Sequence, residues 1–537
     1  MSRKSVLLII VILGTFSIIA TFNIRIVKAT WVEGHITNDT TWKFQDSPFI
    51  VINDVIVDSN ATLTIEPRVE VKFGGDFSLT ILGNLSAIGT VGHEIMFTSN
   101  KLQPIAGDWK GIDFQGGHIF LDFCLIEYPD RVRLSGTGKA EIKNSKIHDT
   151  YYEGIELLDI AGVLINGTEF NSINKNPNYS SGAIRAYTCI NVTVSNNAFA
   201  NCMAYAIGAE YGSYLSIMSN FIENCNLRWY SAGINLFGAQ NVAVDGNIVK
   251  ACKGGIDIAT CDNLRISNNR MYNNTYFGIG LRTGGRISNA SIYCNTLYSN
   301  DKGIEATTWY YGAIEDSVRI FNNSICYNTF GIFVGSANSH IEPHYNDIYL
   351  NTFGMNVSNG ATCNATYNYW GDPSGPYHVS MNPTGKGNPV NGNGVDLKFI
   401  PFLTSPQGHI NQPPVAALSV DKRTVNINEI ATFDASNSTD DGRIDYYLFD
   451  FGDGTNSSWT TLSAVAHKYA LNGTYYATVT VMDDYGVTST NAQLIKVQIT
   501  VVPEFPSFLI LPLFMIVTLI AVAIQRRKCV TGRKYSE

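Results

Sequence analysis

Two acidic residues and one arginine occupy equivalent places in a repeated sequence pattern. Asp257 and Glu305 each follow a Gly-Ile pair, and Arg282 lies in the unit between them. If each unit adds one coil of parallel strands, the two carboxylates lie ~9–10 Å apart. Inverting glycosidases use ~6.5–9.5 Å, so that one carboxyl group protonates the leaving oxygen and the other activates water. Arg282 could instead bind the carboxylate of a uronate sugar.

A second group of side chains has the chemistry of a carbohydrate-binding surface. Aromatic residues in the turns before two of the repeat units offer flat apolar faces to sugar rings, and a further acid and arginine belong to the same pattern. These candidates are Trp229, Tyr230, Trp309, Tyr310, Glu210 and Arg185. The alternative for both groups is structural, because acids and arginines on a solvated sheet pair with each other and turn aromatics cover coil edges.

The elements that must position these residues are short strands in a long repeat. Between residues 154 and 355, a small residue followed by Ile or Met recurs every 22 to 29 residues. Around each such pair, apolar and polar residues alternate, as in Gly255-Ile256-Asp257-Ile258-Ala259, which is typical of a strand with one buried side. Repeats that bury their apolar edges only against neighbouring units form solenoids. We therefore expect an all-β chain whose main part is a parallel β-helix.

This register predicts two outward-facing columns. The first column reads Glu156, Arg185, Gly208, Asn235, Asp257, Gly280, Glu305, Phe333 and Asn356. The second column, two residues further on, reads Leu158, Tyr187, Glu210, Phe237, Ala259, Arg282, Thr307, Gly335 and Ser358. The candidate acids and arginines therefore share one face of the solenoid.

Asparagine recurs in phase with the same repeat. The column consists of Asn197, Asn220, Asn247, Asn269, Asn295, Asn322, Asn346 and Asn368. Asparagine tolerates the left-handed backbone of a coil corner, and its side-chain amide can bond the next coil ~4.8 Å away. We expect a buried structural ladder. Cys202, Cys225 and Cys252 each follow a column asparagine by five residues and are expected to stack in the core.

Charge and motif content limit the partners. The 37 Lys and Arg residues against 45 Asp and Glu give a formal charge of -8, which argues against nucleic acid as a partner because no surplus of cations exists to neutralise phosphates. The sequence has no Cys-x-x-Cys pair and no regular histidine spacing, so it predicts no metal site. It also has no nucleotide-binding motif and predicts no cofactor.

The two ends of the chain have the pattern of targeting segments. Residues 1–29 combine Arg3-Lys4, an apolar run and a small-residue site at Ala29, as in a secretory signal peptide, with an uncleaved anchor as the alternative. Residues 503–525 include about twenty apolar residues, enough to cross ~30 Å of hydrocarbon. Residues 526–537 form a basic tail that is expected in the cytoplasm. The bulk of the chain is therefore expected outside the cell, attached through the C-terminal segment.

Sequons for N-linked glycosylation occur throughout this outer part, so we expect a glycoprotein. The candidates for modification are Asn38, Asn60, Asn84, Asn166, Asn178, Asn191, Asn456 and Asn472.

Segments on both sides of the repeat resemble a known architecture. Ala61-Thr62-Leu63-Thr64-Ile65 and Asp108-Trp109-Lys110-Gly111-Ile112 resemble the first coils of right-handed β-helix surface proteins, and Asn368-Tyr369-Trp370-Gly371-Asp372 resembles the run that closes them. The resemblance implies a right-handed parallel β-helix over residues 30–405. That family includes lyases, hydrolases, epimerases and adhesins, so the resemblance implies a fold and no single activity.

A second domain follows a linker at residues 406–413. Phe449-Asp450-Phe451-Gly452-Asp453-Gly454 and Val479-Thr480-Val481-Met482-Asp483 resemble a PKD domain, which implies an immunoglobulin-like β-sandwich over residues 414–500. Calcium binding is one interpretation of its aspartates, and capping of turns by the same carboxylates is the favoured one. The aspartates in question are Asp434, Asp440, Asp441 and Asp453.

The tail adds a further resemblance. Pro503-Glu504-Phe505-Pro506-Ser507 resembles the PEF-type sorting signal of archaeal surface proteins, which implies that a sortase removes the span. Two functions remain open at this point. The first is a surface-anchored protein that binds glycans or neighbouring envelope proteins. The second is a polysaccharide lyase or inverting glycoside hydrolase that acts on the same sheet face.

Overall fold

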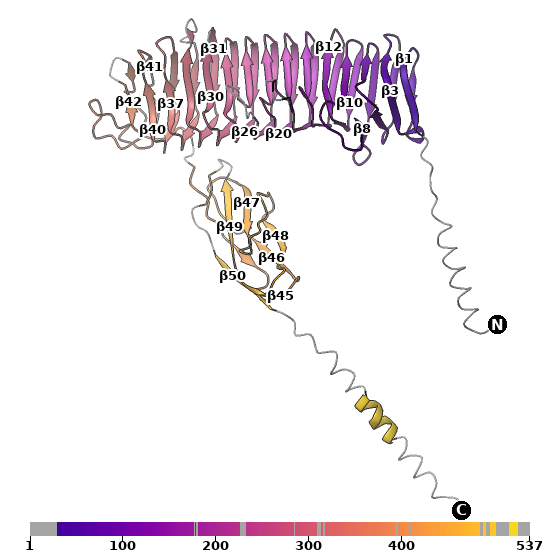
Figure 1. Ribbon diagram of the computed structural model, residues 1–537. Helices are drawn as coiled ribbons and strands as arrows, with labels where there is room; N and C mark the ends of the chain where they lie inside the picture. Colours follow the sequence, from indigo (N-terminus) through magenta and orange to yellow (C-terminus); the bar gives the residue numbers. More distant parts are fainter. Residues whose placement is uncertain are drawn as a thin grey trace, which may run out of the picture. The chain divides into compact units, whose positions relative to one another are not determined.

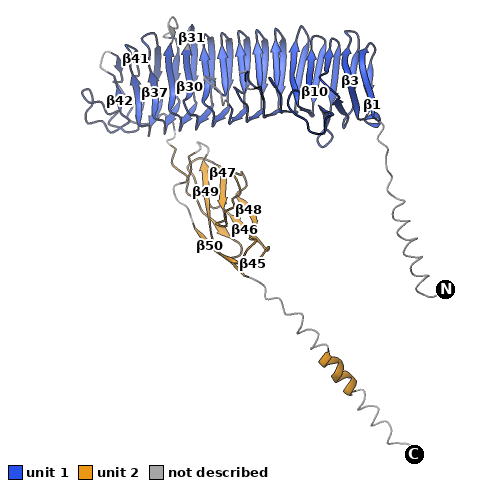
Figure 2. Ribbon diagram, viewed as in Figure 1, with its two compact units in different colours: residues 1–410 blue, residues 411–537 orange. Residues whose placement is uncertain are grey.

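The chain forms two compact units, residues 1–410 and residues 411–537 (Figure 2). The computed structural model describes residues 29–176, 178, 181–225, 232–283, 285–308, 313–314, 317–392, 396–408, 411–483, 487–489, 494–500 and 515–524. The predicted signal peptide, apart from Ala29, and the PEF-type motif lie outside the described residues. Residues 515–524 of the predicted membrane segment are helical. Among the described residues, no helix combines the length and apolar character needed to cross a membrane.

The first unit is a parallel solenoid with three strands in each coil (Figure 1). In one coil, β21 (Ile207–Glu210), β22 (Ser213–Met218) and β23 (Phe221–Glu223) follow each other, and β24 (Ile234–Phe237) then pairs in parallel with β21. The three strands belong to three faces, called here the first, second and third face in chain order. This arrangement agrees with the predicted parallel β-helix.

The strands of each face pair in parallel from coil to coil. The first face contains β6 (Ser78–Ile81), β9 (Trp109–Phe114), β12 (Pro129–Ser135), β15 (Ile155–Leu158), β18 (Ile184–Tyr187), β21, β24, β27 (Gly254–Ala259), β30 (Phe277–Thr283), β33 (Lys302–Thr308), β37 (Phe330–Val334), β40 (Phe353–Val357) and β42 (Val390–Asn391). The second face contains β2 (Thr40–Trp42), β4 (Thr62–Ile65), β7 (Asn84–Ile88), β10 (His118–Asp122), β13 (Lys139–Lys143), β16 (Ala161–Asn166), β19 (Ile190–Ser195), β22, β25 (Gln240–Asp245), β28 (Asp262–Ser267), β31 (Arg286–Tyr293), β35 (Arg319–Phe321), β38 (His340–His344), β41 (Thr362–Asn364) and β43 (Leu397–Lys398), with β34 (Ala313–Ile314) beside β31. The third face contains β5 (Glu70–Phe73), β8 (Ile95–Ser99), β11 (Cys124–Glu127), β14 (Lys146–His148), β17 (Glu169–Asn171), β20 (Ala198–Ala200), β23, β26 (Ile248–Lys250), β29 (Arg270–Tyr272), β32 (Thr296–Tyr298), β36 (Ser324–Cys326) and β39 (Asp347–Tyr349). The first coils begin with β1 (Thr30–Ile36), the 3-10 turn η1 (Phe44–Asp46) and β3 (Phe49–Val57), whose two ends pair with β5 and β6.

The core is a continuous stack of apolar side chains inside the coils. Ile256 and Ile258 of β27 are fully buried while Asp257 between them points outward, as the alternating pattern predicts. Each fully buried aliphatic side chain of this size contributes roughly 1.5–3 kcal/mol. Aromatic rings stack between coils in the same way, and the rings of Phe170 and Phe199 lie 4.8 Å apart.

Buried asparagines form a hydrogen-bonded ladder at one corner of the solenoid. The Asn247 side chain donates from Nδ2 to Asn269 Oδ1 at 2.9 Å and to the carbonyl of Ile217 at 2.9 Å. Its Oδ1 accepts the backbone amide of Asn220 at 3.0 Å and the side-chain amide of Asn220 at 2.9 Å. The same bonds join the other predicted members from Asn197 to Asn368, with one exception.

The exception is Asn322, which was predicted to be in the ladder and is exposed. Asn323 takes the buried place and bonds Asn295 and Asn346. Asn322 instead has a φ of 55° and makes the left-handed corner that precedes each ladder residue, as Asn196 does before Asn197. The left-handed residue and the ladder residue are thus neighbours in the sequence. The prediction that one asparagine both makes the left-handed corner and bonds the next coil was wrong.

A second ladder runs parallel to the first, five residues further along each coil. It begins with Cys202, Cys225 and Cys252, which are buried and free. Burial raises the pKa of the Cys252 thiol. Further along the solenoid the same position is asparagine, in Asn274, Asn300, Asn328 and Asn351, and Asn388 from a later part of the chain continues the ladder. The first four have the same five-residue spacing as the predicted cysteines but were not predicted.

The second unit is a β-sandwich. One sheet contains β44 (Ser419–Val420), β46 (Ile430–Asp434) and β48 (Ala464–Lys468), and the other contains β45 (Thr424–Asn426), β50 (Ile495–Thr500), β49 (Gly473–Asp483) and β47 (Ile444–Asp450). Phe433, Phe449 and Tyr469 are buried between them. The unit begins earlier than predicted, because Asn411, assigned to the linker, is buried and donates to Asp483 at 2.6 Å.

We predict that Asn247→Leu destabilises the first unit by at least about 3 kcal/mol, because each buried group left without a partner costs roughly 1–3 kcal/mol. Asn247 serves both neighbouring coils, so several groups lose their partners. Chemical denaturation monitored by circular dichroism measures the difference.

Asn356→Leu is the matched control for this measurement. Asn356 is on the outward face of β40, and its side chain makes no hydrogen bond with the described residues. We expect a change below about 0.5 kcal/mol. Equal losses in the two variants would contradict the role assigned to the ladder.

Candidate functional site

The first face brings the predicted outward columns together. Strand pairing joins Asp257 to Gly280 and Gly280 to Glu305, and the same register extends back to Glu156 and Arg185. The second column is also in register where strands pair, so Tyr187 is beside Glu210 and Glu210 is beside Phe237. The two predicted carboxylates therefore do lie two coils apart on one face.

Asp257 and Arg282 form a close ion pair. Arg282 donates from Nε to Asp257 Oδ1 at 3.1 Å and from Nη2 to Oδ2 at 2.6 Å. The guanidinium carbon also lies 4.4 Å from the centre of the Phe277 ring. Both side chains are largely covered, with exposed fractions of 17% for Asp257 and 13% for Arg282. The ion pair uses both carboxylate oxygens of Asp257 and two N–H donors of Arg282.

The electrostatics of the two candidate acids differ. Burial raises the pKa of Asp257, and Arg282 opposes this shift. Glu305 faces a different cation, because Lys302 Nζ lies 3.6 Å from its carboxylate. Asp257 thus has a raised pKa, as a proton donor requires, but the proton would have to compete with Arg282. The arrangement fits a charge-paired surface as well as it fits a catalytic pair.

A larger charge network lies nearer the start of the same face. Glu156 Oε2 accepts from Arg131 Nη1 at 2.9 Å and from Arg133 Nε at 2.9 Å, and its Oε1 lies 3.5 Å from Arg185 Nη1. Arg131 also contacts the fully buried Glu153 at 3.0 Å. Burial alone would raise the pKa of Glu156, but Arg133 and Arg131 outweigh it and the pKa is lowered.

The predicted carbohydrate-binding residues Arg185 and Glu210 belong to the edge of this network. Arg185 donates to both carboxylate oxygens of Glu210 at 3.3 Å. The four aromatic candidates of the same prediction, Trp229, Tyr230, Trp309 and Tyr310, lie outside the described residues.

Three other aromatic side chains gather beside Arg185 and Glu210. The Tyr187 and Tyr211 rings meet edge to face at 5.8 Å, and the Tyr211 and Phe237 rings do so at 5.2 Å. Tyr211 is 53% exposed and Phe237 is 42% exposed. Large exposed rings next to a polar pair provide apolar faces with hydrogen-bonding groups at their edge. We call Tyr187, Tyr211 and Phe237 the aromatic cluster.

Three of the four candidate aspartates of the second unit cap turns, as the favoured interpretation predicted. Asp434, Asp440 and Asp453 each accept the backbone amide two residues further on, and Asp441 accepts the amide of Gln412. Asp453 also bonds His467 at 2.8 Å. Among the described residues, no group of three or more His, Cys, Asp or Glu side chains is arranged to hold a metal ion.

The candidate sequons differ in accessibility. Asn84 and Asn166 are half-buried, and their side-chain amides donate to Thr62 at 3.3 Å and to Ser195 at 2.8 Å. The exposed candidates are Asn38, Asn60, Asn178, Asn191, Asn456 and Asn472.

Two family models match this chain, one in each unit. The model for the right handed beta helix region matches residues 86–213 and 161–314, and the model for the PKD domain matches residues 411–499. The chain contains a right-handed β-helix region and a PKD domain. These matches agree with the parallel solenoid of the first unit and the sandwich of the second.

Individual relatives match parts of the chain. Collagenase ColA of Clostridium perfringens is 34% identical over 114 residues, which cover 20% of this chain and 10% of the collagenase. The PKD1 domain of the Vibrio cholerae metalloprotease PrtV is 34% identical and covers 16% of this chain and 99% of that domain, with a TM-score of 0.14. An exopolygalacturonase from Thermotoga maritima is 12% identical and covers 58% of this chain and 80% of its own, with a TM-score of 0.29.

Several residues of this face escaped the sequence analysis. Arg131 and Arg133 precede the first small-Ile pair, so the repeat did not assign them to a column. The alternation of charged and apolar residues in Arg131-Val132-Arg133-Leu134 is the signal that could have found them. Tyr211 lies just after a strand, at a corner with a φ of 56°, where strand periodicity gives no information.

We predict that Glu156→Gln lowers the free energy of unfolding by about 3 kcal/mol at pH 7, because it removes the buried charge that its three arginine partners share. The pKa of Glu156 is lower in the folded protein than its ordinary value of 4.5. Its stabilisation is therefore present above that value and disappears as pH falls through the folded pKa. Denaturant melts of both proteins between pH 7 and pH 3 measure the difference.

The control is Glu169→Gln. Glu169 is 50% exposed and lies 3.5 Å from Lys146. An exposed pair of this kind contributes less than about 1 kcal/mol. A difference between wild type and Glu156→Gln that stays constant or grows towards acid pH would contradict the assignment.

Proposed function

We propose that this protein is a cell-surface protein whose first face binds glycans, either a polysaccharide or the sugars of a neighbouring envelope glycoprotein. The observation that carries the proposal is the aromatic cluster beside the paired Arg185 and Glu210. Sugar rings pack their apolar faces on exposed aromatic side chains, and their hydroxyls bond the charged groups next to them. The long parallel sheet supports an extended ligand, because it repeats the same spacing from coil to coil.

The proposed location follows from the ends of the chain. A signal peptide at residues 1–29 would deliver the bulk of the protein to the outside, and residues 503–525 would hold it at the membrane with the basic tail at residues 526–537 inside. In this proposal, removal of the span at the PEF-type motif would still leave the protein on the outer surface. The PKD domain then acts as a spacer between the β-helix region and the anchor.

We predict that Tyr211→Ala and Phe237→Ala each weaken glycan binding by about tenfold, or about 1.4 kcal/mol, because each removes one ring of the aromatic cluster. A glycan array identifies ligands of the wild-type protein, and isothermal titration calorimetry then measures the affinity of each variant.

Tyr476→Ala in the PKD domain is the matched control. Tyr476 is 53% exposed, the same fraction as Tyr211. We expect it to leave the affinity unchanged. Binding that survives both substitutions in the aromatic cluster, or no glycan ligand at all on the array, would refute the proposal.

A second candidate function is a polysaccharide lyase or inverting glycoside hydrolase. The observation that favours it is the raised pKa of Asp257 on the same face as Glu305. In this reading, Asp257 would give a proton to the leaving oxygen and Glu305 would activate water, with Arg282 near a uronate carboxylate. Arg282 already binds both oxygens of Asp257, which is why we rank this function second.

We predict that the protein releases no reducing ends and no unsaturated uronates from a panel of polysaccharides, because the ion pair occupies the candidate acid. Reducing-sugar assays and absorbance of unsaturated uronates measure both reactions. Turnover that is abolished by Asp257→Ala and also by Glu305→Ala would overturn the ranking and make the protein an enzyme.

A further inference from the structure

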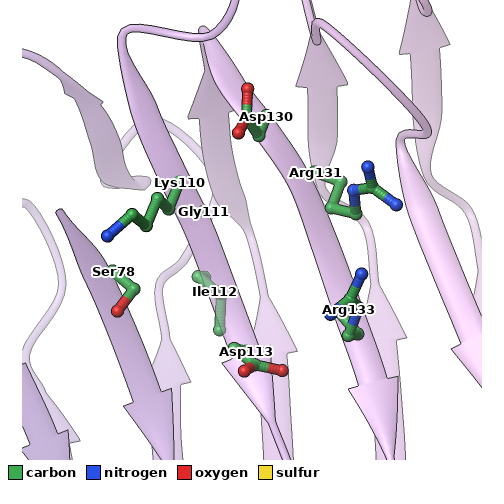
Figure 3. Close-up of a pocket in the computed structure, with 8 residues that line it drawn as sticks. All are labelled: Ser78, Lys110, Gly111, Ile112, Asp113, Asp130, Arg131 and Arg133. Carbon is green, nitrogen blue, oxygen red and sulfur yellow. The ribbon is translucent and has the colours of Figure 1, made fainter. Parts of the chain in front are cut away.

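The first face has a polar hollow of about 260 Å³ near its start, away from the aromatic cluster. Figure 3 shows its lining on three neighbouring strands, β6, β9 and β12, around Gly111 and Ile112. The residues that could contact a ligand are Ser78, Lys110, Asp113, Asp130, Arg131 and Arg133. Arg131 and Arg133 also belong to the charge network of Glu156, whereas Ser78, Lys110, Asp113 and Asp130 belong neither to that network nor to the aromatic cluster.

Gly111 makes the close approach of the strands possible. Its φ is 107°, and a Cβ at this position would lie 1.7 Å from the carbonyl oxygen of Arg131. A side chain is therefore excluded from this position by both backbone conformation and space. The hollow stays open because its centre has no side chain of its own.

Two cations of the hollow have unused hydrogen-bonding capacity. Arg133 is 43% exposed, and only its Nε is engaged, with Glu156 at 2.9 Å. Lys110 is 49% exposed, and the nearest carboxylate to its Nζ is Asp54 at 4.0 Å. Among the described residues, neither the terminal nitrogens of Arg133 nor the ammonium of Lys110 has a hydrogen-bond partner. Such groups are suited to hold an anion.

Two carboxylates of the same hollow can accept hydrogen bonds. Asp130 has no side-chain hydrogen bond to any described residue, and burial together with the nearby Asp76 raises its pKa against the effect of Arg131 and Lys110. Asp113 Oδ2 accepts from Gln115 at 2.8 Å. Its Oδ1 is buried without a partner in the described part of the chain. An unpartnered buried oxygen is costly unless a ligand or water satisfies it.

We propose that this hollow binds the carboxylate-bearing sugar of an acidic polysaccharide. Lys110 reaches toward Asp54 on one side of the hollow and Arg133 toward Glu156 on the other, so each cation holds the carboxylate of a different sugar unit of the chain (Figure 3). Asp113 and Asp130 accept hydrogen bonds from ring hydroxyls between them. A phosphate dianion would bring two negative charges next to two aspartates, whereas a uronate brings one charge and several hydroxyl donors. The inference rests on the proposed function, because it assigns a class of glycan to the same face.

The hollow and the aromatic cluster can serve one extended chain. Strand pairing runs from β12 through β15, β18 and β21 to β24 without a break. Four strand spacings of ~4.8 Å give about 19 Å between the hollow and the aromatic cluster. One polysaccharide that lies along the face can therefore place a carboxylate in the hollow and a ring on the aromatic cluster.

The test is a titration of the full-length protein with defined oligomers of galacturonate, glucuronate and mannuronate, and with their carboxyl methyl esters. Calorimetry at low salt measures each affinity. We expect at least one acidic oligomer to bind ten times more tightly than its uncharged ester, and we expect this advantage to fall as salt is added.

Substitutions locate the binding. Lys110→Gln and Arg133→Gln should each weaken binding of the acidic oligomer about tenfold and leave binding of the ester unchanged. Lys110→Gln is the decisive variant, because it breaks no close contact and we therefore expect it to melt at the same temperature as the wild type. Lys139→Gln is the control, since Lys139 is 56% exposed but belongs to β13 on the second face.

The possible results separate the two proposals. If acid and ester bind equally and Lys110→Gln binds like wild type, the hollow is not the carboxylate site, although the glycan-binding function stands. If Lys139→Gln loses as much affinity as Lys110→Gln, the attraction is a general effect of charge and the inference is wrong. If no oligomer of either kind binds, the inference about the hollow is wrong, and the glycan-binding function is then decided by the glycan array alone.

Discussion

Hydrogen bonds between equivalent residues of successive coils determine how the first unit is built. Parallel strands leave polar backbone groups at every corner of the solenoid, and these groups are buried. Asn247 satisfies them in both directions, because it accepts the amides of Asn220 and donates to Asn269 and Ile217. Each ladder residue is fixed by the residue before and the residue after it. A slip of one residue would leave this corner unpaired, so the ladder fixes the register of the coils from Asn197 to Asn368.

A constant register decides what happens on the outer surface. Side chains of one column stand one strand spacing apart, which is close enough for opposite charges to pair and for like charges to repel. Glu156 lies between Arg133 and Arg185 for this reason. Asp257 instead meets Arg282 across the two columns, because its direct neighbour in the next coil is Gly280. These paired charges satisfy one another and leave little capacity for a ligand. Groups that remain partly unpaired, such as Lys110 and Arg133 at the hollow, are then the ones with capacity for a ligand.

The repeat period and the alternation of apolar residues were sufficient to predict the strands, the outward columns and most of the asparagine ladder. They could not decide between the neighbouring residues Asn322 and Asn323, because both amides suit a corner and only the backbone φ separates their roles. They also did not predict that Asn274 belongs to a ladder, because its column begins with cysteines. The hollow around Gly111 depends on an approach of two strands that no local pattern encodes.

The ladders have a consequence for the length of the molecule. Every step from one ladder asparagine to the next makes the same bonds, so the ladder itself does not distinguish one coil from the next. Adding or removing one whole coil would bring two asparagines together in the arrangement that already exists elsewhere. The number of coils is therefore free to change in evolution without a new interface, and the reach of the binding face can be adjusted in steps of ~4.8 Å.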